Sequence, residues 1–427
     1  MSKPTVKVYP SGLRLIVQHM PNFKSVSTNV FVSVGSRDEL PNEHGLSHFV
    51  EHMLFKGTKT RSAEDISSTL DGLGADINAY TSNDATCYWT KSIAANVEEC
   101  IDVLSDMYFN TQFADEEFVK EQGVIIQEIH MRDDNPRSAM FDLARETFFA
   151  GTKLGHDIAG TVADINSFKS ADIYNYIKKH YVAPKTIVSF AGDITIEEAE
   201  RLTQKYFENV FASRGGNLPP VIKDTDSGTK VIPPRAFVTK TKDTEQHNVT
   251  VFFPIINNVH PDKYIWAYIY EILAAGMSSR LFTNVREKQG LVYAISGGVA
   301  LHDIGGYFYI WFSCTPENTP KVLKTIASEI KKFKLEGPTD EEMSKVRNQR
   351  HTQELFNAEQ TQVMGTRNPT SLAEFNEIKT IDEFLSLINK VTREDVMRAS
   401  GEFLNFDNIV VAAVGREVSI KPFDILK

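Results

Sequence analysis

The segment from Leu46 to about Phe55 constrains the fold more than any other part of the sequence. The preceding stretch Pro41–Gly45 predicts a turn, and the residues that follow it predict a helix. On this helix His48 and His52 lie four positions apart, so both imidazoles project from one face. Two imidazole nitrogens at this spacing can bind one Zn²⁺ at about 2.0–2.1 Å. The fold must therefore present this helix to a third ligand and leave one coordination position open.

Glu51 lies between the two histidines and directly before His52. A carboxylate in this position can stand next to the metal without binding it, and can accept a proton from a zinc-bound water that attacks a carbonyl. The order H-x-x-E-H reverses H-E-x-x-H, and both are metallopeptidase motifs. A pattern with three defined positions also arises by chance, and helices bury single histidines for packing.

A third ligand is available on a second helix, which the sequence predicts over residues 115–131. Glu121 and Glu128 lie two turns apart on the same face, with Val124 and Ile125 between them. We expect this face to be partly buried, where a carboxylate is paired or metal-bound. The alternative is a solvated acidic face, because further acidic residues crowd the start of the helix.

The overall charge and the cysteine content exclude several classes of protein. The formal net charge of −10 argues against nucleic acid or an anionic membrane as the main partner, since both favour basic patches. The three cysteines, Cys87, Cys100 and Cys314, include no C-x-x-C pair and predict neither a disulfide framework nor a cysteine zinc site. No stretch approaches the length of a membrane span, and the N-terminus lacks the features of a secretory signal. We therefore expect a cytoplasmic protein.

The chain of 427 residues is too long for one ordinary core and predicts more than one domain. Residues 215–234, rich in Gly and Pro, predict a linker between an N-terminal half (1–214) and a C-terminal half (235–427). Each half follows an order of strands and helices that predicts an α+β fold, with a mostly antiparallel sheet covered by helices. The similar runs 185–192 and 408–415 suggest the duplication of one α/β unit.

Most of the expected elements follow from local patterns. We expect a hairpin at 6–9 and 13–17, and helices at 46–55, 63–73, 94–110, 115–131, 262–275, 279–288 and 319–335. Further strands are expected at 27–34, 75–81, 86–92, 185–192, 248–253, 293–299, 306–313 and 408–415.

The stretch HGLSHFVEHMLFKGT, from His44 to Thr58, resembles the active-site helix of the pitrilysin-type metallopeptidases, in the branch of the bacterial and mitochondrial processing peptidases. In that family a glutamate ligand follows the motif after about 75 residues, which matches Glu128. The resemblance implies that His48, His52 and Glu128 bind Zn²⁺ and that Glu51 is the general base. It also implies that Glu121 supports the site.

Two further regions extend the resemblance. The stretch Gly74–Thr81 is similar to the family's edge strand, which implies that Asn78 and Ala79 pair with substrate backbone. The stretch Arg286–Tyr293 is similar to the R-x-x-x-G-L-x-Y segment of the second half. It implies that Arg286 and Tyr293 reach the zinc site and hold substrate carbonyls. Without the resemblance, these residues would be expected to form an ordinary strand, a surface arginine and a core tyrosine.

Some positions depart from the family pattern. The stretch Thr152–Thr161 lacks the usual His-Pro and Pro, which leaves its loop geometry open, and Asp84 replaces a common glutamate. Ala274-Ala275 replaces a Gly-Gly. An extended glycine-rich loop, which marks the non-catalytic α subunit of the mitochondrial enzyme, does not follow it. The zinc motif is intact, unlike that of the respiratory-complex core proteins.

The resemblance implies a zinc-dependent endopeptidase that cleaves peptides or unfolded precursor segments. It implies a clamshell of two halves in each chain, closed by a second chain into a homodimer or into a heterodimer with a related chain. The alternatives are a non-catalytic scaffold subunit of the same fold and a maturation peptidase dedicated to one precursor.

Overall fold

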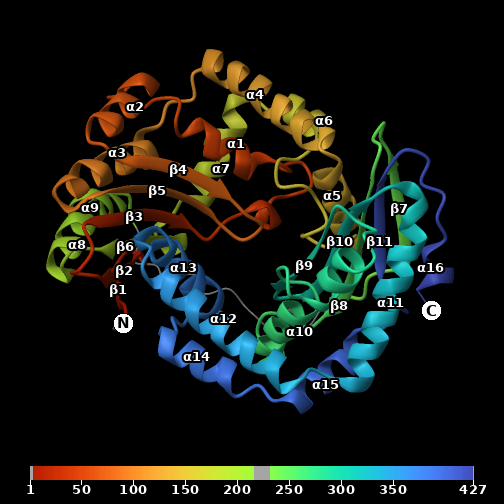
Figure 1. The fold of residues 1–427 in the computed structure, drawn as a ribbon. Coiled ribbons are helices and arrows are strands. Elements are labelled where there is room, and N and C mark those ends of the chain that lie inside the picture. The colour runs from red at the N-terminus through yellow and green to blue at the C-terminus, as the bar shows by residue number, and fades with distance from the viewer. Residues whose placement is uncertain (1–2, 216–230, 427) are drawn as a thin grey trace. The chain divides into compact units, whose positions relative to one another are not determined.

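The computed structural model describes residues 3–215 and 231–426, and these form two compact units (Figure 1). Unit 1 comprises residues 1–129, 156–223 and 354–381, and unit 2 comprises residues 130–155, 224–353 and 382–427. Most of the predicted linker, residues 216–230, lies outside the described part, so the predicted boundaries of the two halves stay a prediction. No helix in the described residues is long and apolar enough to span a bilayer.

Unit 1 is built on a six-stranded sheet with the order β1-β2-β6-β3-β5-β4. All neighbouring strands are antiparallel except β2 and β6, and the predicted hairpin is confirmed as β1 and β2. The edge strands are therefore β1 and β4. The strands are β1 (Thr5–Val8), β2 (Arg14–His19), β3 (Ser25–Val32), β4 (Asp76–Thr81), β5 (Thr86–Ile93) and β6 (Thr186–Gly192).

Unit 2 repeats this arrangement with a five-stranded sheet in the order β7-β11-β8-β10-β9. Its single parallel pair, β7 with β11, corresponds to β2 with β6, and the other pairs are antiparallel as in unit 1. The predicted fold of two similar α/β halves with mostly antiparallel sheets is thus confirmed. The strands are β7 (Ala236–Thr241), β8 (His247–Ile255), β9 (Ala294–His302), β10 (Gly305–Cys314) and β11 (Val410–Gly415).

The helices also follow a common order in the two units. In the first half of the chain the helices are α1 (Leu46–Met53), α2 (Ala63–Gly72), α3 (Val97–Asn110), α4 (Asp115–Asp134), α5 (Pro136–Phe148), α6 (Val162–Ser167), α7 (Ser170–His180), α8 (Ile196–Thr203) and α9 (Asn209–Ser213). In the second half they are α10 (Ile265–Leu273), α11 (Thr319–Glu336), α12 (Asp340–Ala358), α13 (Thr361–Phe375), α14 (Ile381–Asn389), α15 (Arg393–Phe403) and α16 (Pro422–Ile425). In unit 1, α1 and α2 lie between β3 and β4, and α10 lies between β8 and β9 in unit 2. Two long helices follow the next strand in each unit, α3 and α4 after β5 and α11 and α12 after β10. The predicted helix 279–288 is formed in its centre by a π-helical turn, Phe282–Glu287.

Each sheet is covered on one face by a helix from the other half of the sequence. In unit 2, Met140 and Phe148 of α5 pack in one apolar cluster with Phe252 of β8. In unit 1, Leu372 of α13 packs with Ile187 of β6. Helix α5 lies against β7, β8 and β11, and α13 lies against their counterparts β2, β3 and β6. The chain therefore exchanges equivalent helices between its two units, an arrangement that the sequence does not predict.

Candidate metal centre

One face of helix α1 is buried in the core of unit 1, so the opposite, polar face is directed away from the core. Leu46, Phe49, Val50 and Met53 are at most 2% exposed. Their spacing is that of one helical stripe. The ring of Phe49 stacks on Phe118 of α4, with 4.8 Å between centroids. This packing leaves the opposite face, with the two histidines, directed away from the core.

The N-terminus of α1 is held by a buried carboxylate. Glu39 accepts hydrogen bonds from the backbone N–H groups of Gly45 (2.9 Å) and Ser47 (2.7 Å) and lies 3.3 Å from Nε2 of His156. The hydrogen bond with Glu39 raises the pKa of His156. Gly45 adopts φ +98°, and a Cβ there would lie 2.6 Å from the carbonyl oxygen of Ala159. A carboxylate at a helix N-terminus interacts favourably with the helix dipole. These contacts therefore fix the start of α1, which we call the metal helix because it carries His48 and His52.

Helix α4 faces α1 with a stripe that carries both predicted glutamates. Phe118, Glu121 and Ile125 are buried, and Glu121 is only 4% exposed. Glu128 follows two turns after Glu121, and its side chain is 35% exposed. The expectation that this face is partly buried is confirmed for Ile125 but wrong for Val124, which is 49% exposed. Val124 lies one position before the stripe and so points outward.

His48, His52 and Glu128 form one compact group of possible metal ligands. Nε2 of His48 lies 3.3 Å from Nε2 of His52, and Oε2 of Glu128 lies 3.7 Å and 3.6 Å from these two nitrogens. A tetrahedral zinc with bonds of about 2.0–2.1 Å holds its ligand atoms about 3.3–3.4 Å apart. The three atoms therefore fit a single zinc ion. Among the described residues, this is the one cluster of three or more such side chains.

Glu121 contacts Nδ1 of His52, while Nε2 of the same ring faces His48 and Glu128. Its Oε1 lies 2.8 Å from Nδ1 of His52, and its Oε2 lies 2.5 Å from Nζ of Lys56. Burial opposes ionisation of Glu121, but the hydrogen bonds from His52 and Lys56 outweigh it and lower the pKa of the carboxyl. A charged Glu121 accepts the Nδ1 proton and leaves the Nε2 lone pair for the metal. Lys56 was not predicted, since no ligand spacing singles it out.

Glu51 lies on the same face and is held by the edge strand. Thr81 of β4 donates a hydrogen bond from Oγ1 to Oε2 of Glu51, at 2.5 Å. Burial raises the pKa of Glu51, and the hydrogen bond from Thr81 and the neighbouring His52 offset part of that effect. The carboxylate is thus oriented and more basic than a solvated one. Thr81 lies 30 positions after Glu51, so sequence spacing did not reveal this contact.

Strand β4, which carries the predicted substrate residues, pairs on one side with β5 and is the last strand of its sheet. Asn78 is opposite Trp89 and Ala79 is opposite Tyr88. Oδ1 of Asn78 accepts a hydrogen bond from the backbone N–H of Ala79. The edge of β4 that has no partner strand in the described part of the chain therefore belongs to the strand that also contacts Glu51.

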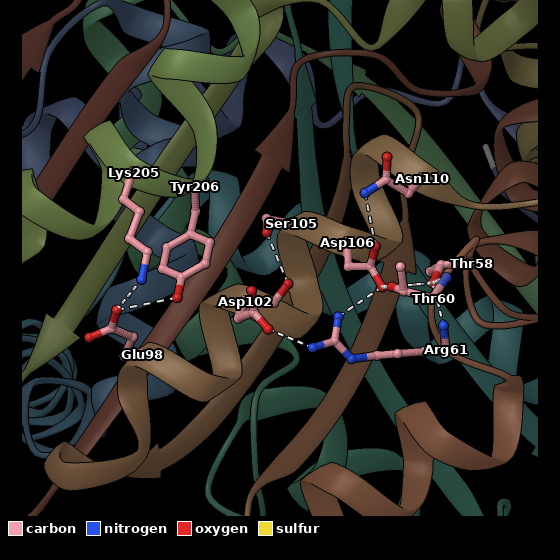
Figure 2. A network of polar contacts seen from close by, with 10 residues as sticks. All are labelled: Thr58, Thr60, Arg61, Glu98, Asp102, Ser105, Asp106, Asn110, Lys205 and Tyr206. Carbon is pink, nitrogen blue, oxygen red and sulfur yellow. Dashed lines mark hydrogen bonds and ion pairs between the residues drawn. The ribbon is translucent and has the colours of Figure 1, made fainter.

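The segment that follows α1 is anchored to α3 by a network of polar contacts (Figure 2). Asp106 is its centre and is 6% exposed. It accepts hydrogen bonds from Thr58 (2.7 Å), Thr60 (2.9 Å), Arg61 (2.8 Å) and Asn110 (2.9 Å). Burial would raise the pKa of Asp106, but these bonds outweigh it and lower the pKa. The network thus holds the chain that leaves the metal helix.

Arg286 and Tyr293 belong to unit 2. The guanidinium of Arg286 lies 4.8 Å from the ring centroid of Phe282, and Tyr293 is 76% exposed just before β9. Tyr293 is therefore not the core tyrosine of the alternative interpretation. The predicted contacts of both residues with substrate stay a prediction.

The counterpart of the metal centre in unit 2 holds an ion pair. Helix α10 occupies the place of α1 in the order of elements, and α12 that of α4. Glu271 of α10 pairs with Arg350 of α12, with 2.7 Å between Oε1 and Nη2. Helix α10 carries no histidine. Unit 2 thus has the equivalent helix pair without the ligands.

Two family models match most of the chain. Residues 14–162 match the family model "Insulinase (Peptidase family M16)", and residues 167–350 match "Peptidase M16 inactive domain". A zinc protease of Streptomyces coelicolor, described as uncharacterized, is 31% identical over 92% of this chain and 86% of its own length. The uncharacterized zinc protease YmxG of Bacillus subtilis is 30% identical over 90% of this chain and 92% of its own.

Solved structures show the same fold. The crystal structure of a protease from Helicobacter pylori matches with a TM-score of 0.87 at 20% identity, over 97% of this chain and 99% of that one. The family models and the curated relatives together cover the metal helix, the ligand on α4 and the second unit. The chain therefore belongs to peptidase family M16.

Proposed function

We propose that this protein is a zinc-dependent endopeptidase that cleaves peptides or unfolded polypeptide segments. The observation that carries the proposal is the triangle formed by Nε2 of His48, Nε2 of His52 and Oε2 of Glu128, with side lengths of 3.3–3.7 Å. Glu51 lies on the same face without belonging to the ligand set. This set of three ligands and one adjacent carboxylate is that of a catalytic zinc site.

The residues of the chain would divide the reaction among them. His48, His52 and Glu128 would hold the metal, and Glu121 would keep His52 in the tautomer that binds it. Zinc, when bound, supplies a Lewis acid that polarises the scissile carbonyl and acidifies water. Glu51 would accept a proton from the attacking water and deliver it to the leaving amine. The raised pKa of Glu51 suits this double role.

Substrate binding is proposed along the edge of β4. The backbone of Asn78 and Ala79 would pair with an extended peptide, which tolerates many side chains. From unit 2, Arg286 and Tyr293 would donate to the carbonyls of the bound peptide and stabilise the developing oxyanion. We further propose that two chains associate as a homodimer, and light scattering measures the mass that tests this.

The substitution Glu51→Gln tests the proposed chemistry. We expect the purified variant to bind one zinc per chain, as elemental analysis would show, and to lose hydrolysis of a mixed peptide library read by mass spectrometry. The control is Glu64→Gln, which removes an exposed carboxylate on α2 and leaves both measurements unchanged. Cleavage retained by a clean Glu51→Gln preparation would exclude the proposed mechanism. A wild-type chain without zinc or activity would instead favour a scaffold subunit.

A further inference from the structure

Unit 1 contains a cavity that shares no residue with the proposed metal centre. Its volume is about 550 Å³. It lies where the C-terminal ends of α3, α7 and α9 meet residues 181–184. This volume is within the usual range for small-molecule sites, about 300–1,000 Å³.

The inner wall of the cavity is a rigid aromatic surface. Tyr108 and Phe211 are buried, and Phe109 packs edge-on against Phe211 with 5.0 Å between ring centroids. The rings of Tyr108 and Phe211 are 5.9 Å apart in a similar geometry. At the rim, Tyr174 of α7 is 59% exposed. These rings offer a flat apolar part of a ligand several faces and edges to pack against.

The charged side chains of the cavity are all cationic. Lys59, Lys178 and Arg214 line it, and no Asp or Glu among the described residues does. Arg214 lies over the ring of Phe109 at 4.8 Å and donates to its carbonyl oxygen at 3.4 Å. Within residues 3–215 and 231–426, no carboxylate lies within 4.0 Å of these three cations. Such a cluster is unusual in a chain whose net charge is −10.

The partial negative charges at the helix ends do not neutralise the three cations of the cavity. The C-termini of α3, α7 and α9 each contribute roughly half a negative charge. Together they offset about half of the three positive charges, so the cavity remains net positive. An anionic group would complete the compensation, and the aromatic wall would take an apolar group attached to it.

We propose that this cavity binds a small amphipathic anion, in which an aromatic or acyl group carries a carboxylate, sulfonate or phosphate. The apolar part packs against Tyr108, Phe109 and Phe211. The anionic part lies at the rim, within reach of Lys59 and Lys178. The site is separate from peptide cleavage and does not require zinc.

A pair of fluorescent probes tests the proposal on the full-length, zinc-loaded chain. Anilinonaphthalene sulfonate carries the anion, and phenylnaphthylamine is its neutral counterpart. We expect one sulfonate probe per chain, weaker binding at higher salt, and displacement by phenyl phosphate. The double variant Lys59→Gln/Lys178→Gln is expected to weaken binding of the sulfonate probe about fivefold to tenfold, as for contacts with two exposed charges. Its affinity for the neutral probe should change less than about twofold.

A matched control separates local from overall charge. The double variant Lys24→Gln/Lys179→Gln removes the same charge from exposed positions outside the cavity and should leave both affinities unchanged. Tyr174→Ser should weaken both probes, because it removes an aromatic wall. Near-ultraviolet circular dichroism checks that every variant stays folded. The proposal is overturned if the wild type does not bind the sulfonate, or if the two lysine pairs affect it equally.

Discussion

The contact between Glu121 and His52 allows the contribution of one buried carboxylate to metal affinity to be worked out. In the wild-type chain, Nδ1 of His52 lies 2.8 Å from Oε1 of Glu121. The Glu121→Gln side chain has nearly the same shape and can still accept a hydrogen bond from Nδ1 through its amide oxygen. It loses its charge. A charge-assisted hydrogen bond contributes about 1.5–3 kcal/mol and a neutral one about 0.5–1.5 kcal/mol. The variant therefore loses about 1–2 kcal/mol of zinc binding, roughly a 5- to 30-fold weaker affinity.

Zinc affinity would be measured by competition with a chromophoric chelator at neutral pH. Glu117→Gln is the matched control, because it removes a carboxylate one turn earlier on α4 that is 34% exposed and pairs with nearby Lys120. Lys56→Met supplies a second comparison, since it removes the other partner of Glu121 but leaves the carboxylate of Glu121 in place. We expect it to lower the stability of the metal-free protein more than its zinc affinity. If Glu121→Gln binds zinc within twofold of the Glu117→Gln control, the reasoning is refuted.

Three further predictions concern stability. Burial, with the nearby charge of Lys185, lowers the pKa of His180 to about 4, so the unfolded state binds more protons between about pH 4 and 6.5 and stability falls as pH drops through this window. Between about pH 6.5 and 4, the free energy of unfolding of the chelator-treated His180→Gln variant should fall by about 3 kcal/mol less than that of the wild type. Urea unfolding at several pH values measures this, and parallel pH dependences of the two proteins would contradict it. Asp106→Asn should cost about 2–4 kcal/mol, because three donors converge on one oxygen, and an unchanged thermal midpoint would show that the network is dispensable. Gly45→Ala should lower the free energy of unfolding by about 2 kcal/mol or more, because φ is positive and the new Cβ would clash with Ala159. It should also weaken zinc binding. The control Gly74→Ala, at an exposed position with φ +62° and no clash, should change zinc affinity less.

The elements around the metal helix could be predicted from sequence because local signals define them. The predicted helix 46–55 is α1 (Leu46–Met53), and the predicted strand 86–92 is β5 (Thr86–Ile93). In both, the period of buried residues and the flanking turn residues agree with the final structure. The similar runs 185–192 and 408–415 are β6 and β11, which occupy equivalent positions in the two sheets.

The contacts that hold the site could not be predicted, because they join residues far apart in the chain. Glu39 and His156 meet at the N-terminus of α1 although 117 positions separate them. Nothing in the period of either segment indicates this. The roles of α5 and α13 were hidden for a different reason. Neither is among the predicted helices, and the buried face of α13 mixes Thr361, Gly365 and Asn368 with apolar residues, so no clear apolar stripe marks it in the sequence.

The exchange of α5 and α13 has a consequence for how the chain is made. The second face of the sheet in unit 1 is covered by residues 361–375, which leave the ribosome only after the 231–353 segment of unit 2. Until then Phe31 and Ile187, both at most 2% exposed in the finished protein, lie on an uncovered face of β3 and β6. An apolar sheet left open during synthesis invites aggregation or binding by chaperones. Unit 1, although its first segment carries the zinc motif, is therefore completed only after residues 231–353 of unit 2 have been synthesised.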